Sequence, residues 1–308
     1  MRIVYMGTPE FAVPSLEILL DNGYDIPAVV TAPDKPGGRH GLQVSAVKKC
    51  ALERGLRVMQ PEKLKNPAFL EELRSLKADL QVVVAFRMLP EIVWNMPPLG
   101  TMNLHGSLLP KYRGAAPINW AVINGETETG LTTFLLKHEI DTGDMLFQER
   151  LPIGENETAG ELHDRMMLLG AQLVLKSVQA IERGDARPMP QSDAEASHAP
   201  KIFHETCHIN FEQPTTQVHN FIRGLSPYPG AWTELDGKTV KILRTEKERL
   251  GNGEWGLGVR PQPGAFFSDG KNFLKISTLD GYVQVLELQM EGKRRMNVRE
   301  FLNGYRLV

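Results

Sequence analysis

The sequence has little cysteine, no long apolar run and no excess of charge of either sign. Its two cysteines, Cys50 and Cys207, argue against a disulfide framework and a tetrahedral thiolate metal site, so we predict a cytoplasmic protein without a bound metal. No segment reaches the roughly 20 apolar residues that cross a bilayer, and the first apolar stretch meets Gly7 too early for a signal peptide. The 35 basic and 37 acidic residues nearly cancel, so any binding to nucleic acid must depend on local patches.

The first half of the chain alternates short β-rich segments with helical patterns, which is typical of a wound parallel sheet. We expect strands at residues 3–6, 28–31, 57–59, 80–85 and 102–104, and helices at residues 14–21, 47–54 and 67–76. The opening turn Gly7-Thr8-Pro9 lacks the glycine spacing of a dinucleotide site, and no acidic residue ends the next strand. We therefore predict an α/β, Rossmann-like domain that does not bind a nicotinamide cofactor.

The second half has a different pattern. A helix is expected over residues 158–184, with an apolar stripe that indicates core packing, and a segment rich in proline and small polar residues follows it. We expect short strands at residues 240–244, 255–259, 265–268, 273–278 and 282–289. Such strands suggest a small β-barrel of the OB type found in oligonucleotide binders. The predicted organisation is a catalytic domain at residues 1–188, a linker at 189–204 and an OB-like C-terminal domain at 205–308.

The most informative segment runs from Met102 to Pro117. Asn103 and His105 alternate with the apolar Met102 and Leu104, so a strand would present both polar side chains on one face. An amide donor beside an imidazole suits a reaction in which a carbonyl oxygen gains negative charge and protons move near neutrality. A strand end whose asparagine caps the following loop explains these two residues alone equally well.

The wider pattern resembles the formyltransferases that use 10-formyltetrahydrofolate, whose signature is Asn-x-His, then Ser-Leu-Leu-Pro, then an Asp some thirty residues later. The matching residues here are Asn103, His105, Ser107, Leu108, Leu109, Pro110 and Asp141. The resemblance implies catalytic roles for Asn103, His105 and Asp141. It also implies that the Ser-Leu-Leu-Pro loop contacts the folate. Asp141 alone fits a turn residue equally well, and the resemblance favours it over Asp144.

Within that family the chain resembles the members that formylate methionine on initiator tRNA, giving the formylmethionyl-tRNA that starts translation. This likeness rests on residues 7–12, on residues 113–118 and on residues 288–293 leading into Met296, so it covers nearly the whole chain. It implies a tRNA partner, a folate co-substrate and a C-terminal domain that holds the tRNA. We expect a monomer.

Two segments depart from the usual family pattern. Phe86-Arg87-Met88 stands where the family commonly has Tyr-Gly, and we assign Phe86 to the folate pocket wall. The loop at residues 34–46 keeps its glycines and Arg39 but lacks some of the usual lysines and prolines. Because glycines leave this backbone permissive, we expect a closing loop whose Arg39 contacts the tRNA.

Two further groups of residues allow alternative interpretations. His204, Cys207 and His208 lack a fourth metal ligand, so a structural role at the domain junction is favoured. The basic run of Lys293, Arg294 and Arg295 fits either a solvated turn or a contact with RNA phosphates. We assign these three residues to tRNA binding.

Two other functions fit parts of the sequence. A formyltransferase acting on an amino sugar nucleotide shares the Asn-x-His and Ser-Leu-Leu-Pro site, although residues 114–117 and 292–296 argue against it. A non-enzymatic RNA-binding module leaves the grouping of Asn103, His105 and Asp141 without an explanation.

Overall fold

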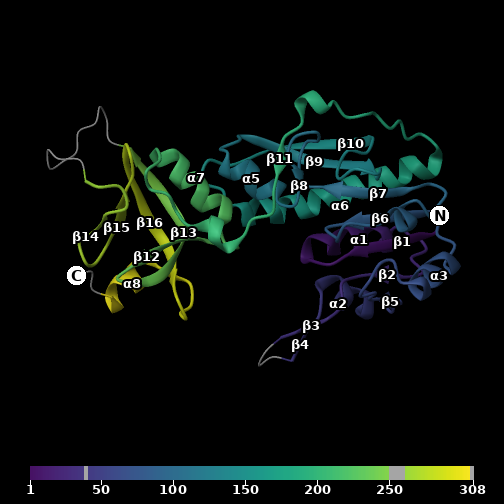
Figure 1. The fold of residues 1–308 in the computed structure, drawn as a ribbon, viewed down its shortest axis with the longest axis horizontal. Coiled ribbons are helices and arrows are strands. Elements are labelled where there is room, and N and C mark those ends of the chain that lie inside the picture. Colours follow the sequence, from purple (N-terminus) through teal and green to yellow (C-terminus); the bar gives the residue numbers. More distant parts are fainter. Residues whose placement is uncertain (38–40, 250–260, 306–308) are drawn as a thin grey trace. The chain divides into compact units, whose positions relative to one another are not determined.

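The computed structural model describes residues 1–37, 41–249 and 261–305. The chain divides into two compact units (Figure 1). Unit 1 comprises Met1–Gly114, Gly130–Leu151 and His163–His198, and unit 2 comprises Ala115–Thr129, Pro152–Leu162 and Ala199–Val308. Two segments that precede residue 188 therefore belong to unit 2 by their packing.

Unit 1 is built on a seven-stranded sheet with the strand order β10-β9-β7-β6-β1-β2-β5. These strands are β1 (Ile3–Gly7), β2 (Val29–Val30), β5 (Val58–Met59), β6 (Leu80–Val84), β7 (Thr101–His105), β9 (Glu128–Leu135) and β10 (Met145–Pro152). The five strands from β7 to β5 pair in parallel, and β9 runs antiparallel to β7. The predicted Rossmann-like fold is confirmed, and every strand that we expected in this half is present.

The helices of unit 1 follow from clear local signals. They are α1 (Val13–Asp21), α2 (Ala46–Glu53), α3 (Pro67–Ser75), α4 (Glu91–Trp94) and most of α6 (Ala159–Arg183). Helix α3 begins where Asn66 accepts a hydrogen bond from the Ala68 amide, and Pro67 occupies its first turn. The Ser45 hydroxyl caps α2 in the same way. The expected helices at 14–21, 47–54, 67–76 and 158–184 are confirmed within one or two residues.

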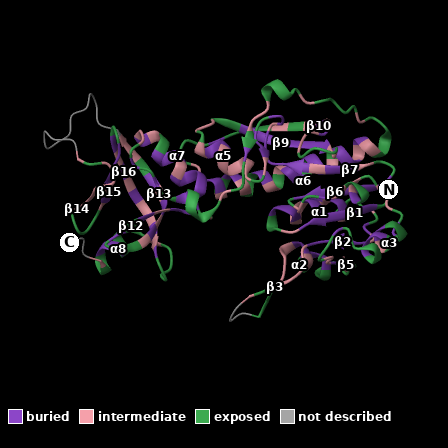
Figure 2. Ribbon diagram, in the orientation of Figure 1, coloured by how far each residue is buried: buried purple, intermediate pink, exposed green. Residues whose placement is uncertain are grey.

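The core of unit 1 lies on the faces of this sheet. All residues of β1 and β6 are buried, and Figure 2 shows this band of buried strands. Helix α6 packs on β7 and β9. The contact is close at Gly170, where a Cβ would lie 2.7 Å from the Leu104 side chain of β7 and 3.7 Å from the Leu131 side chain of β9. The Ser177 and Thr133 hydroxyls form a 2.7 Å hydrogen bond between α6 and β9. The apolar stripe of α6 is therefore core packing, as expected.

Four very short strands complete unit 1 and its boundary. They are β3 (Lys35–Pro36), β4 (Leu42–Gln43), β8 (Arg113–Gly114) and β11 (His198–Ala199). Strands β3 and β4 pair antiparallel at the base of the loop predicted to contact tRNA. Arg39 itself lies outside the described residues.

Unit 2 combines an antiparallel sheet with three helices. The strands are β12 (Ala231–Leu235), β13 (Lys238–Arg249), β14 (Phe266–Ser268), β15 (Leu274–Ser277), β16 (Gly281–Met290) and β17 (Met296–Asn297). The helices are α5 (Pro117–Ile123), α7 (Thr215–Leu225) and α8 (Val298–Gly304). The strand order is β12-β13-β16-β15-β14, with β17 also paired to β16, and register shifts around Arg244 mark an irregularity of the kind that bends a sheet. The domain that we expected to be an OB-like β-barrel is thus built on a curled antiparallel sheet. The strand expected at 255–259 lies outside the described residues.

The core of unit 2 fills the space between this sheet and its helices. It includes Val218 and Ile222 of α7, Val283 and Val285 of β16, and Phe301 of α8. Asn297 caps α8 by accepting from the Glu300 amide, and the Glu300 side chain accepts from the Asn297 amide. None of the helices in the described ranges combines the length and apolar character needed to cross a membrane.

Candidate active site

The sequence motif lies at the carboxyl edge of the parallel sheet. Gly7 of β1 is in register with Val84 of β6, and Val84 is in register with Leu104 of β7. These strands therefore end together, and His105 is the last residue of β7. Open α/β sheets bind their ligands at this edge, so the fold puts the predicted residues where a site is expected.

Asn103 and His105 occupy alternate positions of β7 and so share one face of the sheet. Asn103 is paired with Val83 on one side and Phe134 on the other, and its side chain is partly exposed. Its side-chain amide has no hydrogen-bond partner among the residues that the structure describes. The amide is therefore available to a bound ligand.

His105 is buried, with 6% of its surface exposed, and its ring orientation is fixed by the backbone. Its Nε2 lies 2.8 Å from the carbonyl oxygen of Tyr112. Since a carbonyl oxygen only accepts, Nε2 carries the hydrogen and donates it. In the neutral ring the free lone pair is then on Nδ1, which is the nitrogen that can gain and lose a proton.

Asp141 faces Nδ1 of His105. Its Oδ2 lies 3.8 Å from His105 Nδ1, and the carboxylate is 13% exposed. The Gly114 amide donates to the same Oδ2 at 2.9 Å and holds the carboxylate in place. Asp144 instead pairs with Lys137 at 2.6 Å, so of the two aspartates Asp141 is the one beside His105.

The backbone around the site adopts left-handed conformations that side chains other than glycine rarely take. Asp141 has φ +55°, Tyr112 has φ +60° and Ala85, directly after β6, has φ +46°. Such positions cost about 1–3 kcal/mol each and persist only where surrounding contacts impose them. Two of them, Tyr112 and Asp141, contact the His105 ring, which indicates a functional constraint.

Thr132 organises the Ser-Leu-Leu-Pro loop, although no motif in the sequence marks it. Its hydroxyl donates to the Ser107 carbonyl at 2.7 Å and accepts from the Leu109 amide at 3.1 Å. The Gln148 side chain adds bonds to the Leu109 carbonyl and to Thr132. This loop, with Leu109 and Pro110 buried and Leu108 partly exposed, is a fixed wall next to His105.

Phe86 lies in the segment that follows β6 and packs partly buried against the unit 1 core. The guanidinium of Arg87 stands 5.5 Å from the Phe86 ring centroid and donates to the Pro61 and Glu62 carbonyls. Burial lowers the pKa of Arg87 below its usual value. Arg87 thus holds in place the segment that departs from the family pattern.

The first half of the predicted linker is bonded to the site loops of unit 1. The Gln191 side-chain amide donates to the Asp141 and Gly143 carbonyls at 2.8 Å each, and its Oε1 accepts from Arg113. The Ser197 hydroxyl accepts from the Tyr112 amide at 2.9 Å. We call residues 191–197 the strap. A polar, proline-flanked segment gives no local signal for these contacts.

The His204, Cys207 and His208 cluster packs around an aromatic ring. Trp232 stacks on His204 with ring centroids 5.3 Å apart and meets the His208 ring edge-on at 4.6 Å. Cys207 is buried and its thiol donates to the Phe203 carbonyl. Across the described ranges no group of three or more His, Cys, Asp or Glu side chains is placed to hold a metal ion.

The predicted basic run lies in the turn between β16 and β17. Arg294 pairs with Glu300 at 3.2 Å, and Arg295 pairs with Glu287. Lys293 is exposed and has no acidic partner among the described side chains. The charge of this turn is therefore partly compensated within unit 2.

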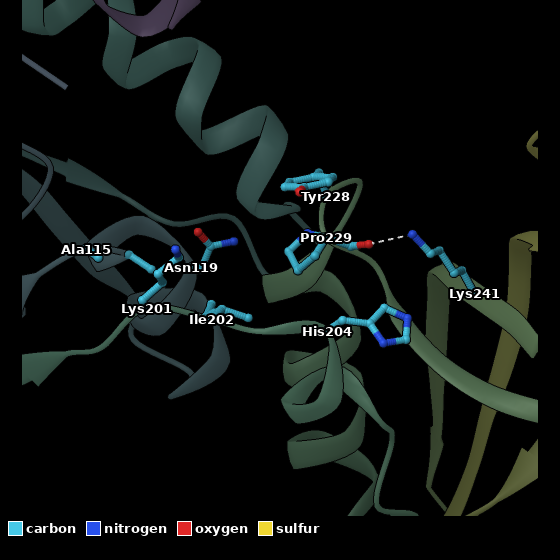
Figure 3. A pocket seen from close by; sticks show the side chains of 9 residues that line it. Ala115, Asn119, Lys201, Ile202, His204, Tyr228, Pro229 and Lys241 are labelled. Carbon is cyan, nitrogen blue, oxygen red and sulfur yellow. Dashed lines mark hydrogen bonds between the residues drawn. The ribbon is translucent and has the colours of Figure 1, made fainter. Parts of the chain in front are cut away.

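Unit 2 also has a hollow of about 300 Å³ (Figure 3). It is lined by Ala115, Ala116, Asn119, Lys201, Ile202, His204, Tyr228, Pro229 and Lys241. Lys241 donates to the Pro229 carbonyl at 2.8 Å, while Tyr228 is 82% exposed. The lining has two lysines and no carboxylate, so it favours anionic groups.

Comparison with known proteins gives one consistent result. Residues 1–178 match the formyl transferase family model and residues 201–306 match the model of the formyl transferase C-terminal domain. The methionyl-tRNA formyltransferase of Parabacteroides distasonis is 54% identical over 100% of this chain and 97% of its own length. That of Phocaeicola vulgatus is 56% identical over 99% of this chain and 96% of its own length.

The fold is also similar to that of a solved structure. The N-formyltransferase from Helicobacter canadensis, in complex with folinic acid and dTDP-3-aminofucose, has a TM-score of 0.69 and 22% identity. The match covers 96% of this chain and 99% of that chain. At this identity the likeness concerns the fold alone.

Proposed function

Because the chain belongs to the formyl transferase family, with full-length relatives that are methionyl-tRNA formyltransferases, we propose how its residues formylate methionyl-tRNA. The enzyme transfers a formyl group to the free amino group of the methionine on the tRNA. The donor in this proposal is 10-formyltetrahydrofolate and the acceptor is the initiator species. In this proposal the reaction takes place in the cytoplasm and the enzyme is a monomer.

The reaction makes two demands on the site. The amino nitrogen attacks the formyl carbon, whose oxygen becomes negative in a tetrahedral intermediate. The C–N bond to N10 of the folate then breaks. Over the whole transfer the attacking nitrogen loses a proton and N10 gains one. The protein must therefore stabilise an oxyanion and move a proton.

Asn103 and His105 supply these functions in our proposal. The side-chain amide of Asn103 donates to the oxyanion, since it is free of other described partners. His105 exchanges the proton at Nδ1, because Nε2 is committed to Tyr112. The carboxylate of Asp141, 3.8 Å from Nδ1, stabilises the positive charge that the ring gains. This His105–Asp141 geometry is the observation that carries the proposal.

We infer the folate contacts from the loops at the same carboxyl edge of the unit 1 sheet. We assign the donor to the loop of Ser107, Leu108, Leu109 and Pro110, whose backbone is fixed by Thr132, and to Phe86. An apolar, rigid loop with a few polar groups is the usual lining for a small ligand. In this arrangement the loop sets the binding of the folate, and Asn103 and His105 act on the formyl group.

The tRNA contacts are proposed for three places. They are Arg39, which lies between β3 and β4 in the sequence, the basic turn of Lys293, Arg294 and Arg295, and the hollow with Lys201 and Tyr228. Basic side chains bind phosphates, and an exposed aromatic ring offers a stacking surface for a base. We assign catalysis to residues 1–188 and tRNA binding to residues 205–308, with 189–204 between them.

The amino sugar nucleotide alternative is disfavoured. The sugar formyltransferase with a similar fold is only 22% identical to this chain, whereas methionyl-tRNA formyltransferases are 53–56% identical over nearly its whole length. A purely RNA-binding role does not account for the fixed His105–Asp141 pair.

The direct experiment is an acceptor comparison with purified protein and 10-formyltetrahydrofolate. Charged initiator tRNA, the same tRNA without methionine, and an amino sugar nucleotide are supplied in parallel. We expect formylation of the methionyl-tRNA only. Formylation of the sugar nucleotide in its place would overturn the proposal.

A further inference from the structure

One side-chain amide joins the two loops that support the catalytic pair. The loop after β7 supplies the Tyr112 carbonyl to His105 and the Gly114 amide to Asp141. The loop before β10 supplies Asp141 itself. Gln191 lies between them and bonds to both.

Both the nitrogen and the oxygen of the Gln191 side-chain amide form hydrogen bonds. Nε2 donates both hydrogens, one to the Asp141 carbonyl and one to the Gly143 carbonyl, at 2.8 Å each. Oε1 accepts two bonds from the Arg113 guanidinium, from Nε at 3.0 Å and from Nη2 at 2.8 Å. An amide can fill all these places only in one orientation, because its two ends differ in donor and acceptor character.

The loop that Gln191 holds is one that needs external support. Asp141 has φ +55°, a conformation that costs free energy for a residue with a side chain. Gly143 packs so tightly that a Cβ there would clash with the Leu135 carbonyl oxygen. The Gln191 bonds on either side of Thr142 therefore fix the short segment whose backbone direction aims the Asp141 carboxylate.

Arg113 extends the same support to the other loop. It is 9% exposed and lies between Tyr112 and Gly114, the two residues whose backbone groups bind His105 and Asp141. The Arg113 amide also donates to the Ser197 carbonyl at 2.9 Å, so both ends of the strap are attached to this loop.

We infer that Gln191 is a positioning residue that sets the alignment of Asp141 with His105. The inference rests on the proposed function of that pair. Gln191 touches neither reacting group, and it acts through the Asp141 backbone and through Arg113. Misplacement of a catalytic group by about 1 Å can cost up to about 100-fold in rate.

The test is Gln191→Glu, which keeps the size of the side chain and its acceptor toward Arg113. The change replaces the two N–H donors with a carboxylate oxygen facing two carbonyls. We expect kcat to fall about 10- to 100-fold, with the KM values for folate and tRNA nearly unchanged. Asp193→Asn is the matched control, since Asp193 also pairs with Arg113 but its side chain is 84% exposed. Removal of such a surface pair has little effect.

A double-mutant cycle separates positioning from general stability. If Gln191 acts through Asp141, Gln191→Glu lowers kcat much less in an Asp141→Asn background than in the wild type. Equal reductions in both backgrounds, or normal kcat in Gln191→Glu, would overturn the inference. If Gln191→Glu does not fold by thermal melting, Gln191→Ala is judged by the same criteria. A wild type without formylation activity, or a fully active Asp141→Asn variant, would instead refute the proposed function.

Discussion

The Nε2–H of His105 donates to the carbonyl oxygen of Tyr112 at 2.8 Å, and this bond decides which ring nitrogen does the chemistry. It leaves Nδ1 facing Asp141, 3.8 Å from its Oδ2. Tyr112 is held in a left-handed conformation, with its amide bonded to Ser197. The histidine that we propose as the catalytic one is thus oriented by a backbone carbonyl.

We expect His105→Ala to lower kcat by about 10²–10⁴-fold, the usual effect of removing a general acid or base. The measurement is the formylation rate at saturating folate and methionyl-tRNA, with circular dichroism to confirm folding. His138→Ala is the control, since that side chain is 86% exposed. Near-normal turnover of His105→Ala would remove this residue from the mechanism.

We expect Thr132→Val to raise the KM for folate and to reduce stability. The change keeps the shape of the side chain but leaves the Leu109 amide and the Ser107 carbonyl without their bonds. Each buried group left unpaired costs about 1–3 kcal/mol. Thr133→Val is the matched control, because its hydroxyl bonds to Ser177 on the opposite face of β9. A control variant with the same rise in KM would show that the loop has no special role.

Neutralising Lys293, Arg294 and Arg295 together tests the basic turn. For every phosphate that the variant no longer binds, the slope of log affinity against log salt should become shallower by about 0.7–0.9. Because Arg294 and Arg295 already pair with glutamates, we expect Lys293→Gln alone to give the largest single effect. The measurement is tRNA affinity at several salt concentrations. Identical slopes for the wild type and the triple variant would exclude this turn as an RNA-binding site.

The pH dependence of stability should depend on His219 of α7. Burial, together with the nearby Arg223 and Lys247, lowers its pKa to about 4, against the weaker opposing effect of Glu155. The unfolded chain binds a proton at this histidine near pH 6.5, whereas the folded chain does not. The contribution of His219 to the free energy of unfolding is therefore fully present above pH 6.5 and decreases as the pH falls toward 4. Because of this residue, acidification from pH 7 to pH 4.5 should lower the free energy of unfolding by about 2–3 kcal/mol.

His219→Gln tests that account through denaturant unfolding at both pH values. Glutamine does not titrate, so the decrease in stability on acidification should shrink by about that amount. His198→Gln, at an exposed position, is the control and should leave the decrease unchanged. An unchanged decrease in His219→Gln would show that another group is responsible.

The sequence predicted the sheet of unit 1 well for a physical reason. Strands such as β1 and β6 are buried along their whole length and nearly continuous in apolar residues, with Gln81 as the one strongly polar residue of β6. Such runs can be recognised in the sequence without knowledge of the neighbouring strands. Strand β9 was not predicted. It is buried on both faces but contains Thr129, Thr132 and Thr133, and the hydroxyls of the last two are satisfied by tertiary contacts.

The candidate site was predicted in part. Asn103 and His105 alternate on one strand, a relation that the sequence itself contains. The strap has the composition of a linker, because Gln191 meets Asp141 across 50 positions of the chain and no local pattern encodes that contact. Thr132 was missed for the same reason. The conformations of these loops depend on contacts between a side chain and a backbone group far away in the sequence. Such contacts leave no periodic pattern in the sequence.

The most direct test of the central claim is the turnover of Asn103→Ala at saturating 10-formyltetrahydrofolate and methionyl-tRNA. The claim is that the carboxyl end of β7 stabilises the oxyanion of formyl transfer. Removal of one oxyanion donor usually lowers kcat by about 10²–10³-fold. We therefore predict that reduction with normal thermal unfolding, because the Asn103 amide supports no other described contact. A folded Asn103→Ala enzyme with wild-type kcat would contradict the account.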